Sequence, residues 1–392
     1  MGGNESIFKV SLKIKKGFIA LGIVASLVMS LNVPVFTVTE EFPRMTAEEK
    51  QAYQEFLNNE QAKHSLKTGK IDVKNASNDE LKAYGILPRP TDSKELTNWM
   101  KIFGNIKEAV PVTLKVTDVY NTSWTFNRTS ANWAGAVNAD TALVQGAYNQ
   151  VGYQNVTGTF IVPDLSQHTQ LPTGVSGFFY PWVGLGGGEN PNTSLIQDGI
   201  GCFRSSGGSY LYSAWWENYS LVPTITVNGQ QQANPYYESP SVEIQGLSIN
   251  PGDSVTVTTS MWPGDNTTMA FIVINNTTGD YVDVIMPTYN AQVVDNSMAE
   301  WIGEQPGWYE PAFLANYGTI NWTGCSYGYG DGATTTWYEM PGLTWDYNRI
   351  NTSYTEGITM YNNGLVDQSI SQPGNDYESF STSWQHYNYG GN

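Results

Sequence analysis

The sequence predicts an all-β protein, an antiparallel sandwich or barrel, preceded by an N-terminal region of a different character. After residue 128, Thr, Val, Tyr, Trp, Ser, Asn and Gly dominate, and short alternating runs recur between Gly, Pro and Asn turns. Such runs are Gly158–Val162, Ser241–Ile244, Ser254–Thr258 and Met269–Ile274. No long amphipathic helix is evident in this part of the chain. About 260 residues fit one all-β domain, which we place at residues 128–392.

The distribution of charge marks the same boundary. The 392 residues include 19 Lys+Arg and 36 Asp+Glu, a net charge of −17. Residues 1–127 carry a net +2, whereas residues 128–392 carry a net −19, and no lysine follows Lys115. The acidic balance argues against a nucleic-acid partner, because phosphates need cations. We expect the N-terminal region to contact the acidic domain at neutral pH and to loosen in acid and in salt.

Residues 1–44 have the pattern of an export signal. Basic residues from Lys9 to Lys16 precede an apolar run over Gly17–Val38, as in the first two regions of a signal peptide. The run is also long enough to suggest a membrane anchor. We expect a secreted protein, with cleavage preferred over anchoring and no membrane association in the mature form.

Residues 45–127 predict a small helical region, which we interpret as a propeptide that inhibits its own enzyme. Thr46 with Glu49 forms a capping box, and Ser77 is a second cap. The expected apolar positions are Ala52, Phe56 and Leu57 in a first helix, and Leu96, Trp99 and Met100 in a third. A spacer or an independent helical domain is the alternative.

The second segment lacks the residues of several common mechanisms. Its two histidines, His168 and His386, have no partner at zinc-motif spacing, and no G-x-S-x-G motif occurs. We therefore expect neither a metal nor a cofactor. Cys202 and Cys325 could form a disulfide in an exported chain or remain reduced.

Carboxylates and amides remain as candidate catalytic groups. Glu300 and Glu304 are spaced so that, on a strand, both lie on the same face as Ile302. A carboxyl group held in an aromatic surface can have a raised pKa and can serve as general base and then general acid. Two exposed glutamates on an edge strand are the alternative.

Several motifs together resemble the glutamic endopeptidase (eqolisin) family in a bacterial or archaeal-type precursor. The order and spacing match over roughly residues 130–325. The motifs are Asn132–Val137, Val156–Pro163, Trp182–Leu185, Leu195–Gln197, Ala214–Glu217, Ile249–Val255, Asn275–Gly279, Ala299–Glu304 and Phe313–Gly318. The resemblance implies an antiparallel β-sandwich of the concanavalin A-like or jelly-roll type, and a secreted acid endopeptidase made as a zymogen.

The resemblance also assigns roles to residues. It implies that Gln197 and Glu304 are the catalytic pair, with Glu300 as the fallback for the glutamate. Glu304 would activate water, and the Gln197 amide would stabilise the oxyanion. The other residues expected to bind substrate are Trp182, Trp215, Glu217, Tyr219 and Glu300.

The chain departs from the family pattern at two acidic positions of the groove, which are Gly186 and Gly201 here. Asp198 and Glu189 are nearby and are candidates to replace them. The expected partners are protein or peptide substrates, and we expect a monomer. Two alternatives remain: a β-sandwich glycoside hydrolase, which would leave Gln197 without a role, and a lectin-like binding module.

Overall fold

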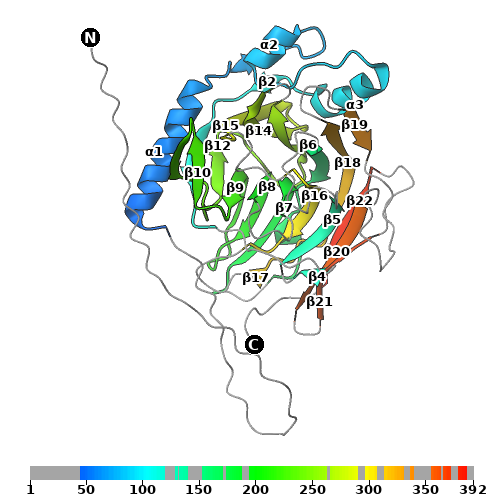
Figure 1. Cartoon of the computed structure of the whole chain (residues 1–392). Coiled ribbons are helices and arrows are strands. Elements are labelled where there is room, and N and C mark those ends of the chain that lie inside the picture. The colour runs from blue at the N-terminus through cyan, green and yellow to red at the C-terminus, as the bar shows by residue number, and fades with distance from the viewer. Residues whose placement is uncertain are drawn as a thin grey trace, which may run out of the picture. The chain divides into compact units, whose positions relative to one another are not determined.

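The computed structural model confirms the predicted antiparallel β-sandwich (Figure 1). The structure describes residues 45–119, 129–130, 132–139, 152–170, 174–187, 194–262, 265–289, 296–306, 313–330, 336–339, 355–362, 365–371 and 378–385. The expected signal or anchor, residues 1–44, lies outside these ranges. Within them, no helix has the length and apolar character needed to cross a membrane.

The first sheet contains the predicted runs 158–162, 254–258 and 269–274. Its neighbours are antiparallel except for β2, which pairs in parallel with β15. In spatial order the strands are β1 (Gly69–Lys70), β2 (Glu108–Ala109), β15 (Asp280–Pro287), β14 (Asp265–Asn275), β13 (Ser254–Trp262), β6 (Gly152–Ile161), β18 (Thr319–Gly330) and β19 (Thr336–Glu339).

The second sheet packs face to face with the first and carries the candidate catalytic residues. All of its neighbouring strands in the following order are antiparallel. They are β3 (Thr113–Val116), β12 (Val242–Gln245), β9 (Tyr210–Ser220), β8 (Ser194–Arg204), β7 (Gly177–Gly186), β16 (Met298–Glu304), β5 (Trp133–Ala139) and β20 (Thr355–Asn362).

Short strands connect the two sheets at one side. β21 and β22 link β20 of the second sheet to β18 of the first. The remaining elements are β4 (Thr129–Ser130), η1 (Leu165–Gln167), β10 (Thr224–Val227), β11 (Gln230–Ala233), β17 (Phe313–Leu314), β21 (Leu365–Ile370) and β22 (Phe380–Trp384).

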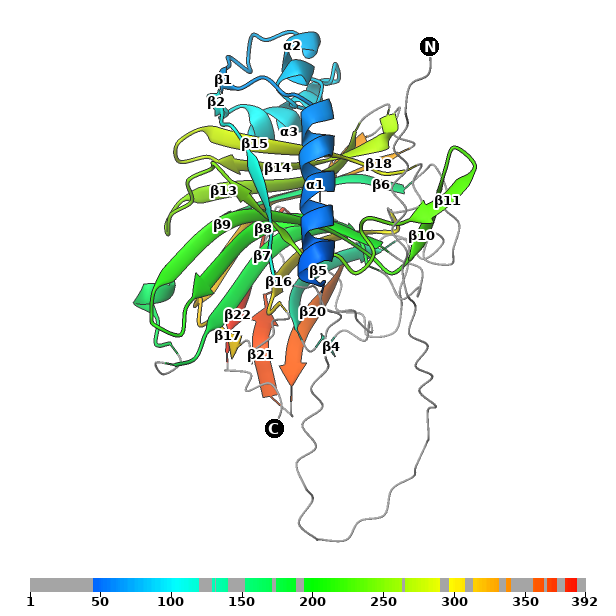
Figure 2. The ribbon, with the colours of Figure 1, turned by 90° about the vertical axis from the view of Figure 1, so that its left-hand side faces the viewer.

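The N-terminal module, which we define as residues 45–116, contains α1 (Ala47–Lys63), α2 (Asn78–Ala83) and α3 (Ser93–Phe103) together with β1–β3. Figure 2 shows α1 running past the edges of both sheets, with α2 and α3 beyond β14 and β15. Both predicted caps are confirmed: Thr46 and Glu49 form the capping box, and Ser77 caps α2.

The predicted apolar face of α1 is partly wrong. Ala52 is exposed, and the buried positions are Tyr53, Leu57 and Glu60, with Phe56 packed beside them. Tyr53 therefore takes the place of Ala52 in the buried stripe, while Phe56 and Leu57 contact the core as predicted. In α3, Trp99 is buried and both Leu96 and Met100 pack against its cluster, as predicted.

The main core lies between the sheets. Trp216 of β9 stacks on Phe271 of β14, with ring centroids 4.7 Å apart. Cys202 and Cys325 are both buried in this core, and no disulfide joins them. Tyr53, Leu57 and Leu114 of the N-terminal module belong to the same apolar cluster.

Candidate active site

The sequence-predicted site residues all lie on one face of the second sheet, the face turned away from the main core. Strand pairing aligns Glu217, Gln197, Gly184 and Glu300 in one row across β9, β8, β7 and β16. Trp215, Gly199, Trp182 and Ile302 form the adjacent row, and Glu304 pairs with Tyr180 in the row beyond. Side chains in alternate positions of a strand share a face, so Tyr219 belongs to this face as well.

Glu304 is an almost completely buried carboxyl group held by hydrogen bonds. Trp182 Nε1 donates to its Oε2 at 2.8 Å, and Asn132 Nδ2 donates to its Oε1 at 3.3 Å. Burial raises the pKa of Glu304 to about 8, and hydrogen bonds, that of Trp182 first, offset part of the rise. In this state Glu304 is therefore protonated at acid and at neutral pH.

Gln197 is fully buried and is oriented by Glu217. Its Nε2 donates to Glu217 Oε2 at 3.0 Å across the β8–β9 pair. A side-chain amide has two N–H groups, so one remains for a further acceptor. The bond to Glu217 thus fixes the direction in which the second N–H points.

Gln197 and Glu304 share no hydrogen bond among the described residues. Gln197 lies on β8 and Glu304 on β16, on either side of β7. Their partners on β7 are four residues apart, which gives a Cα separation of about 17 Å in a flat sheet. Trp182 lies between them: its Nε1 bonds Glu304, and a Cβ added at Gly184 would lie 2.9 Å from its Cζ3. Glu300, in contrast, shares the row of Gln197, about 10 Å away across Gly184.

Glycines on this face lie against neighbouring groups that leave no space for a Cβ atom. At Gly201 a Cβ would lie 2.9 Å from the ring of Tyr180, and at Gly199 it would collide with the Pro181 backbone. Gly201, one of the two departures from the family pattern, therefore leaves space that the Tyr180 ring fills. A carboxyl group at this position would require the ring to move.

Asp198 does not replace the missing acids. It faces the main core, on the opposite side of β8 from Gln197, where Thr259 Oγ1 of the first sheet donates to its Oδ1 at 2.6 Å. Burial raises its pKa well above the usual range. The suggestion that Asp198 supplies a groove acid is therefore wrong, and the other candidate, Glu189, lies outside the described residues.

Most of the site is closed to solvent in this structure. Trp182, Trp215, Glu217 and Glu300 are buried, and Tyr219 is half-buried. The aromatic side chains form an apolar cluster on this face, separate from the main core, and Val119 belongs to it. Val119 lies just after the N-terminal module and reaches the site. Ser241 N donates a hydrogen bond to the Val119 carbonyl.

Sequence reasoning missed three residues that support the pair. Asn132 donates to Glu304, Trp133 packs edge-on against Trp182 with ring centroids 4.9 Å apart, and Tyr180 packs on Trp215 at 5.3 Å. Asn132 and Trp133 were recognised only as part of a strand motif. The hydrogen bond from Asn132 to Glu304 spans 172 residues of sequence, which no local pattern encodes.

Both glutamates lie on an interior strand of the second sheet. β16 lies between β5 and β7, and both Glu300 and Glu304 are buried, so the alternative of two exposed glutamates on an edge strand is wrong. Within the described part of the chain, no group of three or more His, Cys, Asp or Glu side chains is placed to hold a metal ion.

The fold is a β-sandwich that carries Gln197 and Glu304 on one face of its second sheet. A family model described as the peptidase A4 family matches residues 131–359, and the chain belongs to this family. The match confirms the resemblance to glutamic peptidases and favours it over the glycosidase and lectin alternatives.

Known proteins of this kind are similar over the sandwich. Aspergillopepsin-2 of Aspergillus niger is 29% identical over 217 residues, which are 50% of this chain and 63% of that protein. The chain thus spans less than two thirds of that relative's length. Scytalido-glutamic peptidase with a transition state analog inhibitor has a TM-score of 0.43 and 19% identity, over 65% of this chain and 98% of that one. Aspergilloglutamic peptidase from Aspergillus niger has a TM-score of 0.37 and 20% identity, over 53% and 99%.

Proposed function

We propose that this chain is the precursor of a secreted acid endopeptidase of the glutamic type. The observation that carries the proposal is the buried Glu304, held by Trp182 and Asn132 on the same sheet face as Gln197, within the region that matches the family. Proteins and peptides would be its substrates. The basic and apolar pattern of residues 9–38 supports export.

The reaction follows from the two side chains. Glu304, once ionised, takes a proton from a water molecule, whose oxygen attacks the scissile carbonyl carbon. The free N–H of Gln197 donates to the oxygen that becomes negative, which requires both side chains to turn toward each other over Trp182, because their Cα atoms lie about 17 Å apart. Glu304 then returns the proton to the amide nitrogen as the C–N bond breaks, leaving a carboxylic acid and an amine. A neutral amide keeps its donor in acid, where a histidine catalyst would be protonated.

Under this proposal the closed structure is the latent form. With a pKa of about 8, Glu304 is neutral in acid and cannot accept a proton from water. Exposure to solvent would remove the burial that causes this rise and bring the pKa back toward the usual carboxyl range. We therefore propose that the N-terminal region inhibits the enzyme through Val119. Activation would then be a cut of the chain between residues 119 and 132.

The test is incubation of the purified full chain at about pH 3.5, below the usual carboxyl pKa values, with a denatured protein substrate. We expect digestion of the substrate and conversion to a form that begins near residues 120–131. The Glu304→Ala and Gln197→Ala variants should neither mature nor digest. Undiminished activity in both variants would refute the proposal, as would complete inhibition by pepstatin or by a chelator.

A further inference from the structure

Strand β14 is apolar on both faces, which is unusual for a strand of a two-layer sandwich. Phe271 and Val273 face the main core, while Ala270, Ile272 and Ile274 point outward and are 0% exposed. The outer face of an antiparallel sheet is normally solvated and polar. Here α2, α3 and the segments around them cover it, and Trp99, Ile102 and Phe103 share one apolar cluster with the outward residues of β14.

The N-terminal module is also built into the edges of both sheets. β2 pairs with β15 of the first sheet, and β3 pairs with β12 of the second. α1 lies between these edges, where Leu57 is 0% exposed within the main core. Gln54 holds the outer side of β3, because its Nε2 donates to Leu114 O at 2.8 Å and its Oε1 accepts from Val116 N at 3.0 Å.

The polar contacts across this boundary include a hydrogen bond from Tyr281 Oη to Tyr84 O at 2.6 Å and ion pairs that reach the surface. Lys101 pairs with Glu378 at 2.9 Å and Lys115 pairs with Glu243 at 3.2 Å. All four side chains reach the surface, where such pairs contribute little to stability. The attachment of the module therefore depends on apolar burial and strand pairing, which neither acid nor salt removes.

We propose that the N-terminal module stays bound to the sandwich after activation, so that the mature enzyme is a complex of two chains. This inference rests on the proposed function, under which the connection between residues 119 and 132 is cut. The module then acts as a permanent structural part. Only residues 117–119, which follow β3 and which we call the arm, act as the inhibitor. A sandwich without the module would expose the outer face of β14 and leave the β12 edge and the adjoining core uncovered.

The arm has the weak attachment that release requires. Thr117 donates to Ser241 through both its backbone N–H and its side-chain hydroxyl, and Ser241 N donates to Val119 O. Val119 contributes a single side chain to the apolar cluster of the site. A cut beyond it leaves this arm with a free end, while the module keeps its strand partners and its core contacts.

The experiment separates the two roles without using the chain's own activity. Full-length Glu304→Ala protein, with the recognition sequence of an unrelated protease placed within residues 120–128, is cut by that protease. Size-exclusion chromatography and native mass spectrometry follow at about pH 3.5 and at about pH 7, on both sides of the usual carboxyl pKa values, in low and high salt. We expect both fragments to co-elute with the mass of the intact chain under every condition.

Elution of a folded sandwich fragment alone would overturn the proposal, and so would a homodimer of that fragment with the module absent. Release in acid or high salt only would support electrostatic docking instead. Ile272→Asn with Ile274→Asn should release the module, whereas Ile161→Asn, at a position 52% exposed on β6, should not. If the double variant fails to fold, Trp99→Ala weakens the module from its own side. Failure of the proposed function would appear separately, as inactivity of the wild-type chain.

Discussion

At the scale of single residues, the register of the sheet makes the choice between the two glutamates testable. Glu304 accepts hydrogen bonds from Trp182 and Asn132, with Trp133 as a third side-chain donor, and Glu300 lies nearer to Gln197 in the sheet. Donors that bind the ionised form stabilise the charge that a general base needs. The hydrogen bonds to Glu304 therefore support the proposal that it is the base, under which Glu300 has a role in binding.

The Glu304→Gln variant should lose activity by about 10²–10⁴-fold in kcat, the range expected when a general base is removed. Glu300→Gln should change KM more than kcat. Steady-state kinetics on one peptide substrate, using protein already cut by an unrelated protease, compares the two variants without dependence on self-maturation. The opposite ranking would make Glu300 the base.

Trp182 should control the acidic limb of the pH–rate profile. Its N–H donates to Glu304 and favours the ionised carboxyl group, so Trp182→Phe should raise the pKa of Glu304. A base must lose its proton to act, and the acidic limb should therefore move to higher pH. Trp215→Phe is the matched control on the same face, because Trp215 Nε1 has no hydrogen-bond partner among the described residues. An equal shift in both variants would contradict the assignment.

Much of this site could be predicted from the sequence, but its closure could not. The spacing of Glu300 and Glu304 correctly placed both on one strand face, and the motif order brought Gln197 to the same sheet. Contacts such as Asn132 with Glu304 join positions far apart in sequence. Asp198 was misjudged because adjacent residues of a strand point to opposite faces, so proximity to Gln197 in sequence meant separation across the sheet.

At the scale of elements, β3 depends on α1 for its outer hydrogen bonds. Gln54 supplies both a donor and an acceptor to the backbone of β3, which an edge strand otherwise leaves to water. Gln54→Ala should lower the free energy of unfolding by about 1–3 kcal/mol, the range for two hydrogen bonds. Urea unfolding of the Glu304→Ala protein measures this without self-digestion.

Gln51 provides the control on the same helix. Its side chain is exposed and donates to Glu55 of α1 rather than to β3. Gln51→Ala should change the free energy of unfolding by less than about 0.5 kcal/mol, as surface substitutions usually do. A loss as large as that of Gln54→Ala would mean that helix propensity, rather than the contact with β3, determines stability here.

Strand β14 shows where sequence patterns reach their limit at this scale. The run Met269–Ile274 was correctly predicted as a strand. The expected alternation is wrong, because all six residues are apolar and buried, and a short apolar run does not identify the segment that covers it. The covering residues come from helices about 170 residues earlier in the chain, and only the tertiary structure brings them together.

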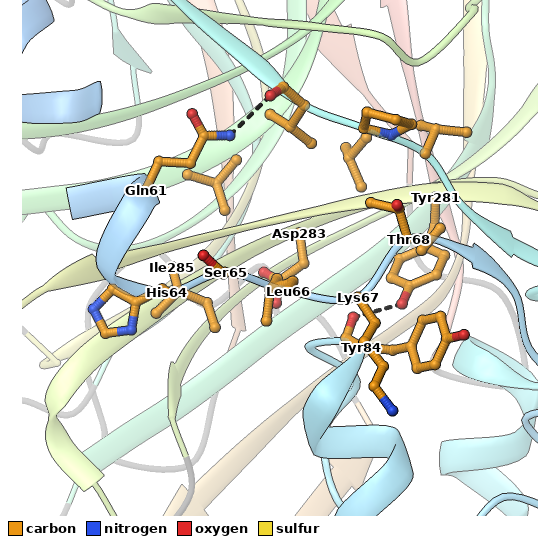
Figure 3. Close-up of a pocket in the computed structure, with 16 residues that line it drawn as sticks. Gln61, His64, Ser65, Leu66, Lys67, Thr68, Tyr84, Tyr281, Asp283 and Ile285 are labelled. Carbon is orange, nitrogen blue, oxygen red and sulfur yellow. Dashed lines mark hydrogen bonds between the residues drawn. The ribbon is translucent and has the colours of Figure 1, made fainter. Parts of the chain in front are cut away.

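At the scale of the whole molecule, acid has opposing effects on the boundary between module and sandwich. Residues 45–116 carry 11 Lys+Arg and 10 Asp+Glu, a net charge of +1, against −19 on residues 128–392, and the small attraction between them fades as carboxylates are protonated. The buried Asp283 acts in the other direction. It lies beneath the N-terminal module, against Leu66 and Gly85, and Figure 3 shows it among residues of both parts.

Asp283 should make the folded chain more stable in acid than at neutral pH. Burial, and then the charge of Asp198, raise the pKa of Asp283 well above the usual range. His64, Lys67 and Tyr84 of the module line the same pocket. Because the folded state binds this proton more tightly than the unfolded chain, the stabilisation is fullest below about pH 4 and is lost as pH rises toward the folded-state pKa.

The Asp283→Asn variant, in the Glu304→Ala background, should therefore gain stability relative to its parent at about pH 7 and little or none at about pH 3.5, on either side of the usual carboxyl pKa. Asparagine keeps the size of the side chain and removes the charge, so a packing effect would be the same at both pH values. Urea midpoints at the two pH values give the comparison. An equal change at both would show that folding does not raise the pKa of Asp283, and the pH response of the boundary would then depend on the surface ion pairs.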